Sequence, residues 1–143
     1  MSVGFLLDTN IPSELMRARP EPKVKDWLAA QDISALFLSV VSIGELESGF
    51  TTMPDAQRRT RLEAWLEQHL VLLFQGRVLP VTQAIAARWG RLDGTRQMRG
   101  RPLNAPDGMI AATALEHGLA VVTRNVKDFA DLDVTVFNPW DAA

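Results

Sequence analysis

The sequence contains no cysteine and only two histidines. The lack of cysteine excludes disulfides, zinc–thiolate sites and thiol nucleophiles. His69 falls on the apolar stripe of an expected long helix and His117 near the end of another, and neither stands close to a candidate nucleophile. A Ser-His-Asp arrangement therefore has no support. The chain also lacks a Gly-rich phosphate-binding loop of the Walker or dinucleotide type.

Long hydrophobic runs are absent as well, and no segment approaches the length needed to span a membrane. The first residues, Met1–Gly4, lack the basic and apolar regions of a signal peptide. We therefore expect a cytoplasmic protein without a membrane partner. The 143 residues, with 47% apolar and 22% charged side chains, suit one domain spanning residues 1–143. The net charge of −2 does not by itself indicate nucleic-acid binding.

Strand-like and helix-like segments alternate along the chain, which predicts an α/β fold with a mostly parallel sheet covered on both faces. Pro80 lies within the third expected strand, which suits an edge position or a strand end. We expect strands at 3–7, 35–40, 78–81, 119–123 and 134–137, and helices at 11–16, 24–31, 42–50, 54–74, 82–98 and 107–118.

Four acidic residues follow, or nearly follow, these apolar strand-like segments: Asp8, Glu45, Asp107 and Asp128. Ligand sites in α/β sheets collect at the carboxyl ends of the strands, so acids far apart in sequence can converge there. Carboxylates that converge need a cation to stay ionised together, and Mg²⁺ or Mn²⁺ is the natural partner of such oxygens. The pattern therefore favours metal-dependent phosphodiester chemistry.

Two of these acids also have a local structural interpretation. Asp8 could cap the following helix, although Thr9 and Asn10 can do the same and would leave its carboxylate free. Ser42 and Glu45 have the spacing of a capping box, and on this residue alone the cap is the favoured interpretation. Only the joint pattern shifts the interpretation towards a common site.

The remaining polar residues near the expected site also have structural alternatives. Asn104 is the expected cap of a helix whose first turn holds Asp107, and the positive helix end should lower the pKa of that acid. Asn125 and Asp128 could each cap a turn after the fourth strand. Thr123 could donate a hydrogen bond to a neighbouring carboxylate and hold it in place.

Arginines gather in two segments, which can be either phosphate-binding patches or solvated helix faces. In the first, between residues 88 and 101, only Asp93 opposes the positive charges. In the second, the basic residues stand among acids of an expected helix. The two groups are Arg88, Arg91, Arg96, Arg99 and Arg101, and Arg58, Arg59 and Arg61.

Four segments together resemble the PIN-domain nucleases, and within them the VapC/FitB-like toxins of type II toxin–antitoxin pairs. They are Leu6–Asn10, Ser42–Leu46, Asp107–Ala114 and Val136–Trp140, and their order and spacing agree over nearly the whole chain. The resemblance implies a three-layer α/β/α sandwich and a site for one or two Mg²⁺ or Mn²⁺ ions. It also implies cleavage of single-stranded RNA, and a homodimer neutralised by a small antitoxin protein.

Carried over residue by residue, Asp8, Glu45 and Asp107 match the acidic triad of the family. The fourth polar position, often Asp in the family, falls on Asn125, which supplies a neutral oxygen and lowers the negative charge of the site. Asp128, three residues later, is a further candidate metal ligand. Asp8, Glu45, Asp107 and Asn125 are thus the catalytic and metal-binding residues that we expect.

Other residues are expected to support this site. Asn10 and Thr123 are candidates for hydrogen bonds to the metal ligands. The candidate RNA-binding residues are Arg96, Arg99, Arg101 and Arg124. Segments 11–15 and 41–73 are the expected surfaces for the second subunit and the antitoxin.

Three alternatives remain open from the sequence. Asn125 favours a catalytically weak PIN-like binding module. A phosphatase with Asp8 as nucleophile would usually need a second Asp two residues later, where this chain has Asn10. An RNA maturation or repair nuclease that is not a toxin would use the same chemistry and differ only in its biological context.

Overall fold

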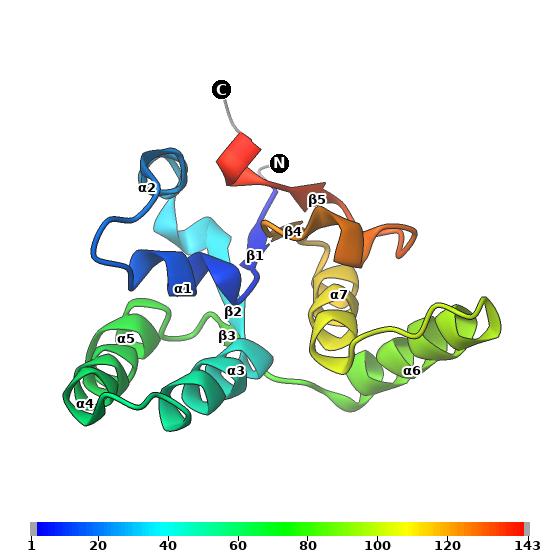
Figure 1. Ribbon diagram of the computed structural model, residues 1–143. Helices are drawn as coiled ribbons and strands as arrows, with labels where there is room; N and C mark the ends of the chain where they lie inside the picture. The colour runs from blue at the N-terminus through cyan, green and yellow to red at the C-terminus, as the bar shows by residue number, and fades with distance from the viewer. Residues whose placement is uncertain (1–2, 142–143) are drawn as a thin grey trace.

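The computed structural model describes residues 3–141, in which a parallel five-stranded sheet forms the centre of the fold (Figure 1). The strands are β1 (Phe5–Leu7), β2 (Leu36–Ser39), β3 (Val78–Leu79), β4 (Ala120–Val122) and β5 (Val136–Phe137). Their order across the sheet is β3-β2-β1-β4-β5, and every pairing is parallel. The predicted parallel sheet is therefore confirmed, and β1 lies at its centre.

Helices cover both faces of this sheet (Figure 1). One face carries α1, α2, α4 and α5, and the other carries α6 and α7, while α3 follows directly from the end of β2. The predicted three-layer α/β/α sandwich is confirmed. The helices are α1 (Asn10–Leu15), α2 (Pro22–Ala30), α3 (Val40–Thr51), α4 (Ala56–Trp65), α5 (Val71–Leu73), α6 (Gln83–Met98) and α7 (Ala105–His117). Short helical turns are η1 (Ile33–Ala35), η2 (Leu66–Leu70), η3 (Val126–Phe129) and η4 (Pro139–Asp141).

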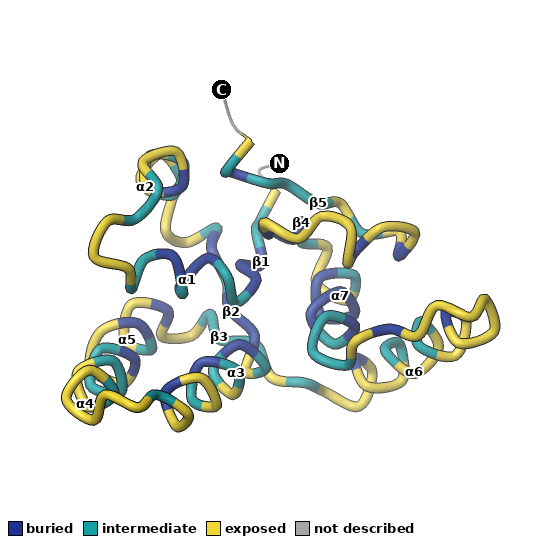
Figure 2. The backbone as a smooth tube through the Cα atoms, in the orientation of Figure 1, coloured by how far each residue is buried: buried dark blue, intermediate teal, exposed yellow. Residues whose placement is uncertain are grey.

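The two layers of helices enclose two hydrophobic cores that share the sheet as a common wall. Successive strand side chains point to opposite faces. Leu6 and Val121 accordingly pack with α7, whereas Leu7 and Val122 pack with α1 and η2. Figure 2 shows the buried residues concentrated along the strands and on the inner sides of the helices. The central strands are thus fixed from both sides at their carboxyl ends.

The expected long helix at 54–74 is present from Ala56 to Leu73, and it contains one π-helical turn. That turn, η2, joins α4 to α5. Its i→i+5 hydrogen bonds change the phase of the apolar stripe. His69, expected on that stripe, is exposed and lies near Trp65, with their ring centroids 6.3 Å apart.

Two further expectations can be compared with the fold. β3 is an edge strand, as the proline at position 80 suggested. Among residues 3–141, no helix is long and apolar enough to cross a membrane.

Candidate active site

The candidate site is built around Asp8, the first residue after the central strand β1. The strand order reverses between β1 and β4, and ligand sites of open α/β sheets lie at such points. The Asp8 backbone N–H donates to the Val122 carbonyl at 2.9 Å, so the residue stays tied to β4. Its side chain is buried, with the residue 4% exposed. The sheet therefore fixes one carboxylate at its centre.

Three donors hold the Asp8 carboxylate in place. The Thr123 hydroxyl donates to Oδ2 at 2.7 Å and the Thr9 backbone N–H donates to Oδ1 at 2.8 Å. Asn10 Nδ2 donates to Oδ2 at 3.3 Å and to Thr123 Oγ1 at 3.1 Å. The supporting positions expected for Thr123 and Asn10 thus correspond to hydrogen bonds in the structure.

Thr9 does not cap α1 with its side chain, and the expectation of such a cap is wrong. Its hydroxyl instead donates towards α3, with Oγ1 2.5 Å from Glu45 Oε1 and 2.9 Å from Ser42 Oγ. Because Thr9 directly follows Asp8, this contact brings Glu45 beside the end of β1. The threonine that was expected to begin a helix therefore joins two parts of the acidic site.

The capping-box interpretation of Ser42 and Glu45 is also wrong. Helix α3 begins at Val40, and its cap is Ser39, whose hydroxyl accepts from the Val41 backbone N–H at 3.0 Å. Ser42 is fully buried, and Glu45 lies in the second turn of the helix, beyond capping positions. The earlier helix start leaves the Glu45 carboxylate available to the site.

Asp107 enters from α7, where the expected cap is confirmed. Asn104 Oδ1 accepts from the Asp107 backbone N–H at 3.3 Å. The next residue, Gly108, faces α6 closely, because an added Cβ would lie 2.6 Å from Trp89 Cδ1. Absence of a side chain at Gly108 thus lets α7 approach α6 at the turn that carries Asp107.

The expectation that the helix end would lower the pKa of Asp107 is wrong. Burial, followed by the negative charges of Asp8, Asp128 and Glu45, raises the pKa of Asp107 to about 6. Burial also raises the pKa of Asp8, against the opposing effect of the hydrogen bonds from Thr123 and Thr9, and Glu45 and Asp128 raise it further. Four carboxylates from separate elements therefore act on one another.

The fourth polar position, Asn125, is less directly engaged. Asn125 is exposed at the start of η3, and its backbone N–H donates to Thr123 Oγ1 at 3.0 Å. Asp128, on η3, contributes negative charge to both Asp8 and Asp107. Asp128 thus supplies an acidic group to the site from the segment after β4.

The donor set suits a hard divalent cation in its chemistry. Carboxylate oxygens are the preferred ligands of Mg²⁺ and Mn²⁺, and mutually repelling carboxylates gain most from a cation between them. Among residues 3–141, no three His, Cys, Asp or Glu side chains lie close enough together to hold a metal ion as they stand. Binding would therefore require at least one of these carboxylates to move closer to the others.

The arginines expected to bind RNA occupy two different places. Arg96 is 9% exposed, donates to the Arg101 carbonyl at 2.9 Å and pairs with Asp131 at 3.1 Å. Arg99 and Arg101 approach the same Asp131 carboxylate at 3.8 and 3.0 Å. The buried guanidinium of Arg96 thus stabilises the end of α6 instead of facing a phosphate.

Arg124 lies beside the acidic site. Its backbone N–H donates to Asn10 Oδ1 at 3.3 Å, and its guanidinium lies over the Trp140 ring, 5.4 Å from the centroid. The side chain is exposed and lines a small polar cavity that also contains Asn125 and Asp128. It is the expected RNA-binding arginine that the fold places closest to the supporting hydrogen bonds.

Thr9 and Ser42 are the site residues that sequence reasoning missed, since both were assigned to helix caps. Two signals could have found them. Thr9 adjoins Asp8 in sequence, and Ser42 lies three residues before Glu45, a spacing that places two side chains on one helix face.

Comparison with known proteins agrees with this fold. Residues 5–134 match the family described as the PIN domain. The chain is 38% identical to Toxin FitB of Neisseria gonorrhoeae over 136 residues, covering 95% of this chain and 98% of the relative. It is 37% identical to VapC ribonuclease Y4jK of Sinorhizobium fredii over 139 residues, covering 97% and 99%.

A solved structure is similar over the same extent. The crystal structure of FitAcB from Neisseria gonorrhoeae contains a chain with a TM-score of 0.89 and 37% identity, covering 96% of this chain and 99% of that one. The family match spans most of the chain, and both relatives exceed a third identity over nearly their full lengths. This chain therefore belongs to the PIN-domain family, as a VapC/FitB-like member.

Proposed function

We propose that this chain is a metal-dependent endoribonuclease that cleaves single-stranded RNA, and that it is the toxin of a toxin–antitoxin pair. The observation that carries the proposal is the convergence of Asp8, Glu45 and Asp107, with Asp128 nearby, at the carboxyl end of the central strand. Burial raises the pKa of both Asp8 and Asp107, and the charges of Glu45 and Asp128 raise both further, which supports a shared site. The relatives named as a ribonuclease and a toxin support the same activity.

The cation would be Mg²⁺ or Mn²⁺, held by Asp8, Glu45, Asp107 and the Asn125–Asp128 segment. When bound, such a cation supplies a water of lowered pKa and positive charge beside the leaving oxygen. Thr123 and Asn10 keep the Asp8 carboxylate in one orientation, and Thr9 steers Glu45 towards it. Arg124, exposed beside the site, would bind a phosphate adjacent to the one cleaved.

The proposal includes partners. The described surface has exposed apolar residues on α5 and η1, with Leu73 46% and Ile33 44% exposed. Both line a cavity of about 380 Å³ whose lining also includes Leu28 and Trp65. Exposed apolar patches of this kind mark protein contacts. We therefore propose a homodimer that a small antitoxin protein inhibits, acting as one domain in the cytoplasm.

The test is cleavage of total bacterial RNA by the purified chain with Mn²⁺. Chelator and Asp107→Asn protein are run alongside, with Asp26→Asn as a matched control, because Asp26 is an exposed acid of α2. Discrete fragments from wild type and Asp26→Asn, lost with chelator and with Asp107→Asn, are expected. Fragments that persist in both of those samples would contradict the proposal.

A catalytically weak binding module is the second candidate. It is favoured by the exposed Asn125 in place of an acid and by the spacing of the acids, since no three described ligands stand together. Calorimetric titration with Mn²⁺ distinguishes the two functions. Absence of binding to folded protein, together with intact RNA, would favour the binding module.

A further inference from the structure

A basic cleft lies between the segment that follows α1 and the exposed side of α4. It has a volume of about 640 Å³. Its lining consists of four arginines and three apolar residues, and includes no acid. The lining residues are Met16, Arg17, Ala18, Arg19, Arg58, Arg61 and Leu62.

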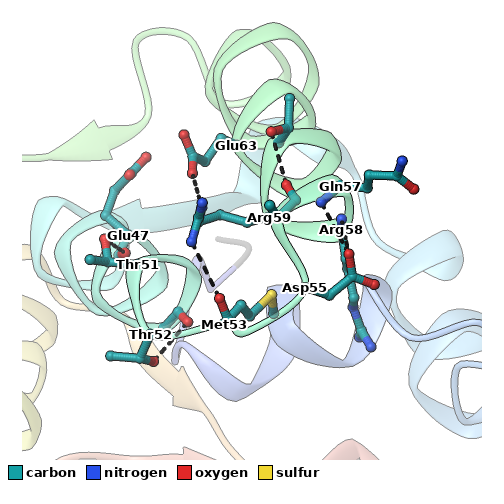
Figure 3. Close-up of polar contacts among 12 residues, drawn as sticks. Glu47, Thr51, Thr52, Met53, Asp55, Gln57, Arg58, Arg59 and Glu63 are labelled. Atoms are coloured by element: carbon teal, nitrogen blue, oxygen red, sulfur yellow. Dashed lines mark hydrogen bonds and ion pairs between the residues drawn. The ribbon is translucent and has the colours of Figure 1, made fainter.

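The arginines of α4 are sorted by helix face. Arg58, Arg61 and Leu62 stand at i, i+3 and i+4 spacing and line the cleft together. Arg59 instead donates to the Met53 carbonyl at 3.3 Å and pairs with Glu63 at 3.7 Å. Figure 3 shows Arg59 directed to Met53 and Glu63, while the Arg58 side chain extends past Asp55 in another direction. The neighbouring arginines at 58–61 therefore lie on two different faces of α4, and only one of these faces lines the cleft.

Most of the positive charge in the cleft is not neutralised within the protein. All four arginines are exposed. Arg17 pairs with the buried Glu14 at 3.4 Å, whereas Arg19, Arg58 and Arg61 form no ion pair within residues 3–141. Arginine forks that lack carboxylate partners fit phosphate groups in two-point contacts. The cleft is thus suited to an anion with several phosphates.

The cleft is joined to the acidic site by one short helix. α1 begins at Asn10, which bonds with Asp8, and Met16 follows its last residue, Leu15. Six helical residues span about 9 Å. An extended single strand that occupies several nucleotides can reach both places at once.

An RNA strand would need a positively charged surface near the acidic site in order to bind there. The site itself carries Asp8, Glu45, Asp107 and Asp128, which repel phosphates, and the whole chain has a net charge of −2. Arg96, Arg99 and Arg101 share the Asp131 carboxylate, so part of their charge is used within the fold. By contrast, three arginines of the cleft form no ion pair within residues 3–141. The cleft, on the α1 side of the site, therefore has more positive charge available for a phosphate.

We propose that the cleft formed by residues 16–19 and the Arg58–Leu62 face of α4 binds the phosphate backbone of single-stranded RNA beside the cleavage site. Its arginines hold phosphates, and Met16 and Leu62 provide an apolar floor for a ribose or base. The inference rests on the proposed ribonuclease function, because it identifies where the flanking part of the same substrate lies.

Binding is tested separately from cleavage. The probe is a labelled single-stranded oligouridylate of about 12 nucleotides, and the protein carries Asp107→Asn so that it cannot cut the probe. Arg58→Gln, Arg61→Gln and the double variant are compared with Arg91→Gln, which removes an exposed arginine of α6 on the opposite side of the sheet (Figure 1). Circular dichroism checks that each variant is folded.

Each phosphate contact to a single strand contributes about 0.7 to the slope of log affinity against log salt. At 0.1 M salt, each cleft substitution should therefore weaken binding roughly fivefold and the double variant roughly 25-fold. The salt slope of the double variant should fall by about 1.4. Arg91→Gln should change neither quantity appreciably.

Cleavage with Mn²⁺ in the otherwise wild-type chain provides the second measurement. The double variant should lose kcat/KM on the long probe and keep it on a dinucleotide, whose single phosphate is the one cleaved, so that none is left for the cleft. Wild-type cleavage with equal RNA binding by the double variant and Arg91→Gln would overturn the inference and leave the proposed function intact. A double variant that binds RNA normally but loses binding of a polyglutamate peptide would also overturn it, and would assign the cleft to acidic protein segments. Arginine-dependent RNA binding without any wild-type cleavage would support the inference and contradict the proposed function.

Discussion

Replacement of Asp107 by Asn should make the metal-free protein more stable at neutral pH. The pKa of Asp107 rises from 3.8 to about 6 on folding, because the residue is partly buried beside three other carboxylates. A raised folded-state pKa means that the charged carboxylate opposes folding. This cost is absent below the unfolded value of 3.8, develops as the pH rises towards 6, and is complete above it.

The size of the effect follows from the shift. One pKa unit corresponds to about 1.4 kcal/mol, so a rise of about two units gives a ceiling of about 3 kcal/mol. Partial exposure and solvent screening reduce this to about 1–2 kcal/mol. Loss of a favourable charge at the α7 N-terminus opposes the gain by about 0.5 kcal/mol. The net gain should therefore be about 1 kcal/mol at pH 7.5.

Urea denaturation in chelator, at pH 7.5 and at pH 4, measures this gain. Within residues 3–141 the Asp107 carboxylate makes no hydrogen bond or ion pair, so its replacement by Asn deprives no other group of an acceptor. The gain should shrink to a few tenths of a kcal/mol at pH 4, and Asp26→Asn should show no gain at either pH. Mn²⁺ should stabilise wild type more than the variant, because only wild type retains all the carboxylates. A variant less stable than wild type at pH 7.5, or an equal gain at both pH values, would refute the electrostatic argument.

Two further predictions concern how the acids are positioned. Thr9→Val removes the hydroxyl that orients Glu45 and should weaken Mn²⁺ binding about tenfold in calorimetry, with Thr9→Ser restoring it; equal affinity in all three proteins would show that this contact does not serve the metal. Gly108→Ala places a Cβ 2.6 Å from Trp89 Cδ1, so the free energy of unfolding should fall by about 1–3 kcal/mol. Gly94→Ala on α6, with nothing within 4 Å, is its control and should gain up to about 1 kcal/mol; similar curves for both would argue against close helix packing at Gly108.

The order of strands and helices could be predicted from the sequence because hydrophobic periodicity is a local property. Leu6, Leu7, Val121 and Val122 read as buried strand residues, and all four are buried in β1 and β4. Asn104 was recognised as a cap because capping depends only on the next three residues. Such local signals are sufficient to predict the sheet and the parallel strands.

The details of the site depended on contacts between distant segments, which local patterns do not contain. Ser39 and Ser42 are both suitable caps by sequence, and only the end of β2 at Ser39 decides between them. Thr9 bonds with Glu45, 36 residues away, and the pairing of Arg96 with Asp131 spans 35 residues. The raised pKa of Asp107 likewise arises from burial and from acids on three other segments, and these effects outweigh the helix-end effect that the sequence indicated.

The central place of β1 also affects the order in which the protein becomes active during synthesis. Asp8 precedes its partners in the chain, because the carbonyl that pairs with its backbone and the hydroxyl that holds its carboxylate come from Val122 and Thr123, the latter 115 residues later. Asp107 also belongs to the last third of the chain. A growing polypeptide on the ribosome would thus expose its first acids without the partners that complete the site. A chain that cleaves RNA would in this way gain its complete site only after the segment that contains Thr123 has left the ribosome.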